Sequence, residues 1–186
     1  MIRIDVPLDS RSYPVVVGNS ILSEFQSLVP PEVSRVAFVT QKGIDVSIPT
    51  ELPSSIHYLP DGEQAKRLSV LEDLCGEFAR EGLTRRDLVV GIGGGVVTDV
   101  AGFAASVYHR GVQVMHVPTT LLGQIDAAIG GKTGVNLEEG KNLVGAFWQP
   151  CAVICDTQLL TSLPKREMRS GMGELAKYHF LGGEQL

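Results

Sequence analysis

Cysteine is scarce in this sequence, which has three in 186 residues, at Cys75, Cys151 and Cys155. A small, odd number of cysteines in a chain of ordinary composition argues against a disulfide framework of the kind that stabilises small secreted domains. Cys151 and Cys155 flank the apolar residues 152–154, so we interpret both as core thiols and not as a metal or redox pair.

The sequence also lacks a basic patch and a long apolar run. Its sixteen Lys and Arg are scattered among twenty-one Asp and Glu, for a formal net charge of −5. This distribution does not predict a nucleic-acid-binding surface. No uncharged stretch approaches the length of a membrane span, and the first six residues alternate apolar and polar where a signal sequence would be basic and then apolar. We therefore expect a cytoplasmic protein without a nucleic-acid or membrane partner.

Two kinds of strand pattern are present. Residues 2–6 and 13–17 alternate on either side of the polar residues 9–12, which predicts a small antiparallel pair at a sheet edge. Short, continuous, β-branched runs follow, as is typical of strands buried on both faces; they lie at residues 36–39, 88–92, 112–117 and 152–154.

Helical patterns lie between and after these runs. Apolar residues spaced three and four apart predict a helix over residues 63–81, with Gly82 capping its carboxyl end. Residues 165–180 contain no proline and no β-branched residue, so a further helix is expected there. Alternating strands and helices predict an α/β fold with a parallel, Rossmann-like sheet and helices on both faces. We expect this domain to span residues 1–164 and an all-α domain to begin in residues 165–186.

Three consecutive glycines, Gly93 to Gly95, join a predicted strand to a helical pattern rich in small residues. The junction suits a pyrophosphate, because glycine lets the backbone approach a ligand and a helix start presents unpaired N–H groups. The usual dinucleotide fingerprint is absent, since Val96 stands where the third glycine belongs and no acid follows about twenty residues later. A tight turn that needs positive φ, without any ligand, is the alternative.

Lys132 and Lys141 lie in glycine-rich surroundings that favour the holding of anionic oxygens, with ordinary solvated lysines as the alternative. Residues 131–133 (Gly-Lys-Thr) look like part of a triphosphate-binding loop. Asp126 occupies the position of the required first glycine, so we reject that site.

Six segments in one order carry the most specific pattern: Asp61-Gly-Glu-Gln-Ala-Lys66, Gly93-Gly-Gly-Val-Val-Thr-Asp99, Pro118-Thr-Thr120, Gly130-Gly-Lys-Thr-Gly-Val-Asn136, Gly140-Lys-Asn-Leu-Val-Gly-Ala-Phe-Trp-Gln-Pro150 and Ser170-Gly-Met-Gly-Glu-Leu-Ala-Lys177. Together they closely resemble the 3-dehydroquinate synthase family. The resemblance covers nearly the whole chain from Arg35 on, and residues 130–150 are its most diagnostic part.

The resemblance implies an amino-terminal NAD-binding domain, a carboxy-terminal helical domain, and between them a cleft with a divalent metal, zinc or cobalt. Family members convert 3-deoxy-D-arabino-heptulosonate 7-phosphate to 3-dehydroquinate and phosphate, in the shikimate pathway of aromatic amino acid biosynthesis. They oxidise a substrate hydroxyl transiently with NAD, which lets phosphate leave by β-elimination. The implied partner is therefore a small sugar-acid phosphate, and by analogy the full-length enzyme is a homodimer.

Matching motif positions also imply roles for single residues. The implied NAD contacts are Asp61, Gly62, Glu63, Gln64, Ala65, Lys66, Gly95, Val96, Val97, Thr98, Asp99, Thr119, Thr120, Lys132, Lys141, Leu159, Leu160, Thr161 and Ser162. The implied contacts of the reacting sugar acid are Asp126, Lys132, Asn142 and Lys177, and the implied metal ligand is Glu174.

Helix geometry bears on the last of these residues. At about 100° per residue, Lys177 lies about 60° around from Glu174 and can face the same cleft; an ordinary surface ion pair is the alternative. His179 falls about 140° from Glu174 and is a poor co-ligand. A catalytic zinc needs about three protein ligands, and the family's two histidine ligands come from its helical domain, so we expect them beyond Leu186 and expect these 186 residues alone to be inactive.

The sequence departs from the family in three places. Thr40-Gln-Lys-Gly43 replaces an Asp/Asn-bearing stretch that helps many members hold the adenosine, which leaves the adenine-side contacts open. Ser162 and Leu137 replace a usual threonine and a common histidine, and neither change removes a group that the reaction needs.

Three other functions compete with this interpretation. Another sugar-phosphate cyclase would share the glycine turn and the metal glutamate, although residues 130–136 resemble the dehydroquinate form. A metal-dependent polyol dehydrogenase has a similar glycine turn. A noncatalytic NAD-binding module is the alternative from outside the enzymes.

Overall fold

The computed structural model describes residues 1–182. Its strands are β1 (Ile2–Val6), β2 (Tyr13–Gly18), β3 (Val36–Gln41), β4 (Ser54–Leu59), β5 (Leu88–Gly93), β6 (Gln113–Pro118), β7 (Lys132–Leu137), β8 (Gly140–Phe147) and β9 (Ala152–Asp156). Its α-helices are α1 (Phe25–Leu28), α2 (Leu68–Arg80), α3 (Gly95–Val107) and α4 (Lys165–Gly182). Its shorter helical turns are η1 (Asp9–Arg11), η2 (Leu22–Glu24), η3 (Gly62–Ala65), η4 (Tyr108–Arg110), η5 (Gly123–Ala127) and η6 (Thr157–Ser162).

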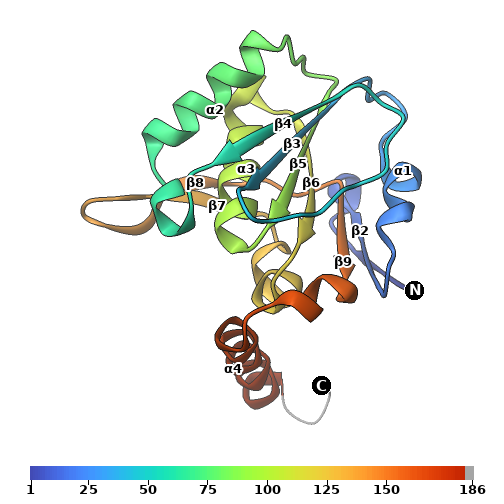
Figure 1. Cartoon of the computed structure of the whole chain (residues 1–186), viewed down its shortest axis with the longest axis vertical. Helices are drawn as coiled ribbons and strands as arrows, with labels where there is room; N and C mark the ends of the chain where they lie inside the picture. The colour runs from blue at the N-terminus through green and yellow to red at the C-terminus, as the bar shows by residue number, and fades with distance from the viewer. Residues whose placement is uncertain (183–186) are drawn as a thin grey trace.

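Seven strands form one sheet in the order β1-β2-β9-β6-β5-β3-β4 (Figure 1). The five strands from β9 to β4 and their neighbour β2 run parallel. The β-branched runs predicted this for β3, β5, β6 and β9. β1 pairs antiparallel with β2 at the edge, with Ile2 opposite Val17, so the predicted edge pair is confirmed. The parallel α/β fold class is confirmed as well.

The sheet is covered on both faces, but by different kinds of structure. On one face α2 and α3 enclose a core that includes Phe78, Val100 and Val114. On the other face Phe25 of α1 and Ile48 from the long β3–β4 connection pack against strand residues. Because that connection contains no helix or strand, apolar side chains of an irregular segment complete the second core.

The predicted helix over residues 63–81 is interrupted near its start. η3 ends at Ala65 and α2 begins only at Leu68, because Lys66 (φ −82°, ψ 61°) and Arg67 (φ −129°, ψ 150°) are not helical. The carbonyl of Lys66 accepts the N–H of Asn136, so a tertiary contact replaces the helical bond. The predicted cap is present, since Gly82 has φ 71° and the next N–H bonds back to Phe78.

The segment after β6 also differs from expectation. The predicted strands stop at residue 117 and resume at residue 152, but β7 and β8 form a separate antiparallel hairpin between them. Figure 1 shows this hairpin extending to one side of the sheet. The preceding turn, η5, is a π-helix, a form that is rare and often found at functional sites.

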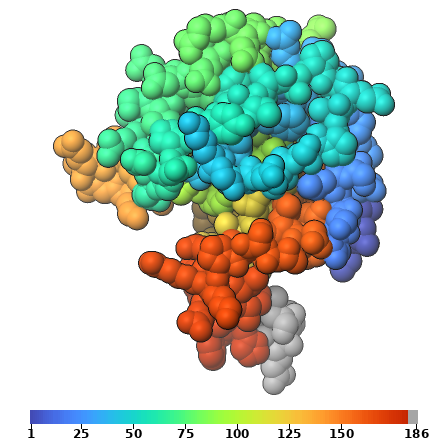
Figure 2. All heavy atoms as spheres, viewed as in Figure 1, coloured from blue at the N-terminus to red at the C-terminus, as the bar shows by residue number. Residues whose placement is uncertain are grey.

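α4 confirms the predicted helix over residues 165–180 and extends it to Gly182. It projects from the body of the molecule beyond the carboxyl ends of the strands (Figure 2). Within residues 1–182, no helix combines the length and apolarity that crossing a membrane requires.

The three cysteines are free thiols. Cys155 is buried in one core cluster and Cys151 packs against another. Burial raises the pKa of each of these two thiols to about 12, so both stay protonated at neutral pH. The interpretation of Cys151 and Cys155 as core thiols is confirmed.

His116 of β6 is the most unusual polar residue of the core. It is 2% exposed, and its Nδ1 has no hydrogen-bond partner within the described residues. Burial lowers the pKa of His116 to about 4. An unfolded chain binds a proton at this histidine near pH 6.5 and the native fold only near pH 4, so stability is lost as pH falls through that window.

Replacing His116 should therefore flatten the acid side of the stability curve. The unfolding free energy of both proteins should fall between pH 7 and pH 4. We expect this fall to be smaller in His116→Leu than in wild type, by up to about 3 kcal/mol. Urea unfolding across this range measures the difference, and the exposed His179→Gln is the matched control. Parallel curves for wild type and His116→Leu would contradict a buried neutral imidazole.

Candidate functional site

The glycine junction lies where the strand order of the sheet reverses. From β3 the chain continues outward to β4, and from β5 it continues in the opposite direction to β6, while β3 and β5 are neighbours. In open α/β sheets, ligands bind beyond the carboxyl ends of the strands at such a switch point. β5 ends at Gly93, Gly94 is the N-cap, and α3 begins at Gly95. The junction therefore lies at the position where ligands bind in open α/β sheets.

Close packing explains the three glycines. A Cβ on Gly93 would lie 2.5 Å from Val97, and one on Gly94 would lie 3.1 Å from Thr120. One on Gly95 would lie 3.2 Å from Ala127. The three are absent from the glycines with positive φ, so the idea of a turn that requires positive φ is wrong. Glycine here allows close approach, and it leaves the first amides of α3 uncovered.

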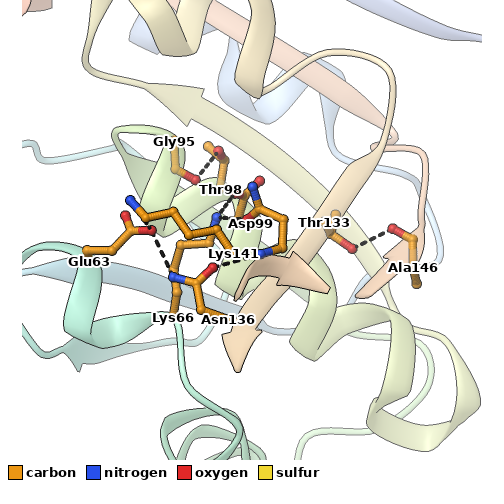
Figure 3. A network of polar contacts seen from close by, with 10 residues as sticks. Glu63, Lys66, Gly95, Thr98, Asp99, Thr133, Asn136, Lys141 and Ala146 are labelled. Atoms are coloured by element: carbon orange, nitrogen blue, oxygen red, sulfur yellow. Dashed lines mark hydrogen bonds and ion pairs between the residues drawn. The ribbon is translucent and has the colours of Figure 1, made fainter. Parts of the chain in front are cut away.

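A polar network lies beside the junction (Figure 3). Lys66 is 5% exposed, and its Nζ donates to Asp99 Oδ2 at 2.5 Å and also to Asn142 Oδ1. Asn136 donates from Nδ2 to Glu63 Oε1 at 2.8 Å and accepts the backbone N–H of Asn142 at its Oδ1. The network thus ties η3, α3 and the β7–β8 hairpin together.

The carboxylates of this network differ in electrostatic environment. Burial raises the pKa of Asp99, although the hydrogen bond and charge of Lys66 oppose the rise. The hydrogen bond from Asn136 lowers the pKa of Glu63, helped by the charges of Lys66 and Lys141. Lys141 itself is exposed and reaches Glu63 only at 3.5 Å. The charge that holds the network together is therefore the buried ammonium of Lys66.

A cavity of about 460 Å³, here called the hairpin cavity, opens between η5 and the β7–β8 hairpin. Its charged and amide side chains are Asp99, Asp126, Lys132 and Asn142. Asn142 has φ 57°, a left-handed backbone that asparagine tolerates better than most residues. Three of the four residues expected to face a sugar acid, Asp126, Lys132 and Asn142, thus share one cavity.

A second cavity, here called the switch-point cavity, has about 390 Å³ and lies under the β3–β4 connection. Thr40 from the end of β3 and Ile92 from the end of β5 line it, with Ile44, Ile56 and Tyr58. The hydroxyl of Thr40 donates to the carbonyl of Ile92 at 2.9 Å. This cavity has a mixed polar and apolar lining and lies by the stretch in which the sequence departs from the family.

The remaining predicted NAD contacts lie at the carboxyl ends of neighbouring strands. Thr119 directly follows β6 and donates its N–H to the carbonyl of Gly93. The Thr120 hydroxyl accepts the N–H of Gly123. Residues 159–162 lie in η6, directly after β9. The fold brings these segments to one edge of the sheet, while their contacts with NAD stay predictions.

α4 places the last two predicted residues. Lys177 and Glu174 form an i,i+3 ion pair, and the hydrogen bond to Glu174 raises the pKa of the exposed Lys177. The next residue, Tyr178, donates its hydroxyl to Asp126 at 2.8 Å. The sequence alone assigned no role to Tyr178 or to Asn136. Both lie next to or inside the recognised segments, but their partners come from distant parts of the chain.

The described residues do not complete a metal site. Residues 1–182 contain no group of three His, Cys, Asp or Glu that could hold a metal ion. His57 bonds to Glu77 of α2, and His116 lies in the core. Glu174 is therefore one candidate ligand, and residues 1–182 do not bring two further donors to it.

Comparison with known proteins gives one family. A family model described as 3-dehydroquinate synthase N-terminal matches residues 56–170. A protein of Amycolatopsis mediterranei (strain S699) named as an aminodehydroquinate synthase is 52% identical over 184 residues, which are 98% of this chain and 52% of the relative. The 3-dehydroquinate synthase of Thermobifida fusca (strain YX) is 45% identical, over 96% of this chain and 51% of the relative. The chain thus spans about half the length of these relatives.

Solved structures give the same fold. A 2-deoxy-scyllo-inosose synthase complexed with carbaglucose-6-phosphate, NAD+ and Co2+ has a TM-score of 0.86 and 31% identity, over 95% of this chain and 50% of that one. The 2-epi-5-epi-valiolone synthase of Streptomyces hygroscopicus, with NAD+ and Zn2+ bound, has a TM-score of 0.76 and 29% identity, over 91% and 50%.

Loss of the Lys66 ammonium should destabilise the fold. We expect Lys66→Met to lower the unfolding free energy by about 2 kcal/mol, because the Asp99 carboxylate loses its partner in a largely buried site that keeps some solvent contact. Denaturant unfolding at pH 7 measures the loss. The exposed Lys141→Met is the control, with an expected change below about 0.5 kcal/mol. Equal losses in the two variants would contradict the central place of Lys66.

Proposed function

The chain belongs to the 3-dehydroquinate synthase family, and we propose that it forms the NAD-binding part of a 3-dehydroquinate synthase. In this proposal the complete enzyme is a carbon–oxygen lyase that converts 3-deoxy-D-arabino-heptulosonate 7-phosphate to 3-dehydroquinate and phosphate. The observation that supports it best is the position of the hairpin cavity, next to the glycine junction and lined by Asp126, Lys132 and Asn142. A homodimeric full-length enzyme remains part of the proposal.

The glycine junction is the proposed binding site of the NAD pyrophosphate. The carbonyl of Gly94 already accepts the N–H groups of Val97 and Thr98, so the amides of Gly95 and Val96 are the ones at the helix start. Helix starts attract anions through such amides and through the helix dipole. The adenosine would then lie toward the switch-point cavity and the nicotinamide toward the hairpin cavity. NAD supplies a reversible acceptor for a hydride.

The side chains of the hairpin cavity suit a sugar-acid phosphate. The Lys132 ammonium can neutralise a carboxylate or phosphate, and the Asp126 carboxylate can accept hydrogen bonds from hydroxyls. Because Lys66 can only donate, it holds Asn142 by the amide oxygen, which leaves the amide N–H groups of Asn142 as donors for a ligand oxygen. The cavity therefore offers both donors and acceptors at fixed positions.

Glu174 is the one proposed metal ligand among the described residues, whereas a catalytic zinc needs about three donors from protein. What this chain contributes in the proposal is the binding and orientation of NAD and of the sugar acid. We expect the 186 residues alone to bind NAD without turnover of the heptulosonate.

A related sugar-phosphate cyclase is the second candidate, and two observations favour it. The relative named as an aminodehydroquinate synthase is 52% identical to this chain, against 45% for the Thermobifida fusca 3-dehydroquinate synthase. Two carboxylates, Asp99 and Asp126, line the hairpin cavity and would attract an ammonium group on a substrate. Calorimetric titration of the NAD-loaded chain with the heptulosonate phosphate and with an amino-substituted analogue compares the two candidates, and tighter binding of the analogue would favour the second.

A methyl group at the junction should weaken NAD binding. In Gly94→Ala the added Cβ lies 3.1 Å from Thr120, which a small shift accommodates, but it stands where the phosphates approach the amides of α3. We expect Gly94→Ala to bind NAD about tenfold more weakly than wild type in calorimetry, which is equivalent to about 1.4 kcal/mol. Gly173→Ala, in an open position of α4, is the control. Unchanged affinity in Gly94→Ala would refute the junction as the NAD site.

A further inference from the structure

α4 meets the body of the molecule at two points near η5. A Cβ on Gly171 would lie 2.7 Å from Leu121 Cβ and 2.9 Å from the Leu122 nitrogen, so the helix backbone comes directly against the residues before η5. About two turns later, Tyr178 donates its hydroxyl to Asp126 Oδ1 at 2.8 Å. Figure 1 shows α4 beside η5, beyond the carboxyl ends of the strands.

Asp126 is held in an unusual backbone. The N–H of Ala128 bonds to the carbonyl of Gly123, five residues earlier, which closes the π-turn of η5. The same turn faces the hairpin cavity, where Asp126 and Ala127 form part of the wall. Among residues 1–182, Tyr178 is the one side chain that donates a hydrogen bond to the Asp126 carboxylate. The backbone of η5 therefore sets where Asp126 lies, while Tyr178 sets how its carboxylate is turned.

We propose that Tyr178 is a positioning residue for the hairpin cavity: its hydroxyl fixes one oxygen of Asp126, so that the other oxygen is presented to a hydroxyl group of a sugar-acid phosphate. This inference rests on the proposed function, because it assigns that ligand class to the hairpin cavity. Tyr178 acts through Asp126 and does not touch the ligand. The same bond ties the position of the Glu174–Lys177 pair on α4 to the cavity wall.

The charged groups around Tyr178 agree with this role. The hydrogen bond to Asp126 is the largest cause that raises the pKa of Tyr178, followed by burial and by the charges of Asp126 and Glu174, while the Lys177 charge opposes the rise. The Lys177 ammonium lies 5.2 Å from the centre of the Tyr178 ring. The raised pKa keeps the phenol of Tyr178 protonated at neutral pH, so Tyr178 is the donor and Asp126 Oδ1 the acceptor.

Calorimetric titration of four variants tests the proposal on the full 186-residue chain, first with NAD and then with 3-deoxy-D-arabino-heptulosonate 7-phosphate on the NAD-loaded chain. We expect Tyr178→Phe, which keeps the ring, to bind the sugar phosphate about fivefold more weakly with unchanged NAD affinity. Asp126→Ala should weaken sugar-phosphate binding at least as much, and the double variant should be no worse than Asp126→Ala alone. Tyr108→Phe removes a phenol hydroxyl that donates to the Leu83 carbonyl and lines neither cavity, so it is the matched control and should bind like wild type.

A spectroscopic titration separates positioning from a merely structural contact. The absorbance of Tyr178, obtained as the difference between wild type and Tyr178→Phe, should titrate at higher pH than that of an ordinary tyrosine, and Asp126→Ala should remove the largest part of this shift. Losses that add up in the double variant, or wild-type sugar-phosphate affinity in Tyr178→Phe, would overturn the proposal. A wild-type chain that binds NAD but not the sugar phosphate would overturn it too, whereas a chain that binds no NAD would refute the proposed function first.

Discussion

Where β5 passes into α3, three parts of the chain pack directly against the backbone of the glycine junction: α3 itself, the loop after β6, and η5. A Cβ at Gly93 would lie 2.5 Å from Val97, while one at Gly94 or Gly95 would lie 3.1 or 3.2 Å from Thr120 or Ala127, so the junction has little space for any side chain. The start of α3 lies at the switch point of the sheet, because α3 follows β5 and the strand order reverses between β5 and β3. Uncovered amides at that position are the physical basis of the proposed NAD site.

The polar network builds on this junction. Asp99 lies one turn into α3, and Lys66 joins it to Asn142 on the hairpin. A buried ammonium with two oxygen partners is stable only when both stay in place, so η3, α3 and the hairpin are positioned as one unit. The hairpin cavity is lined by Asp99 and Asn142 of that unit, and the switch-point cavity by Thr40 and Ile92 at the ends of β3 and β5.

Much of the fold could be predicted from the sequence, because buried parallel strands have a simple signal. Continuous β-branched runs marked β3, β5, β6 and β9, and the change to alternation marked β1 and β2. The interruption of the predicted helix could not be foreseen, since Lys66 leaves helical geometry to make tertiary contacts. The β7–β8 hairpin was missed because its glycines interrupt the apolar pattern of a strand. A Cβ on Gly145 would lie 2.0 Å from the Thr133 oxygen, so glycine lets the two strands approach each other here.

The candidate site was predictable as a set of segments but not as a set of contacts. The recognised motifs contained Lys132 and Asn142, the resemblance also implied Asp126, and the fold brings these three residues to one cavity. Asn136 and Tyr178 were missed because their partners are 73 and 52 residues away in the sequence. Spacing along a helix could relate Lys177 to Glu174, whereas only the packing of α4 against η5 could relate Tyr178 to Asp126.

The most direct test of the junction as a dinucleotide site is an amide NMR titration of the isotopically labelled chain with NAD. We predict that the largest shifts fall on Gly95, Val96 and Asp99, with smaller ones on Thr40 and Thr119. Shifts confined to the opposite edge of the sheet, around Arg85 and Arg110, with an unchanged signal at Gly95, would contradict a dinucleotide site at the start of α3.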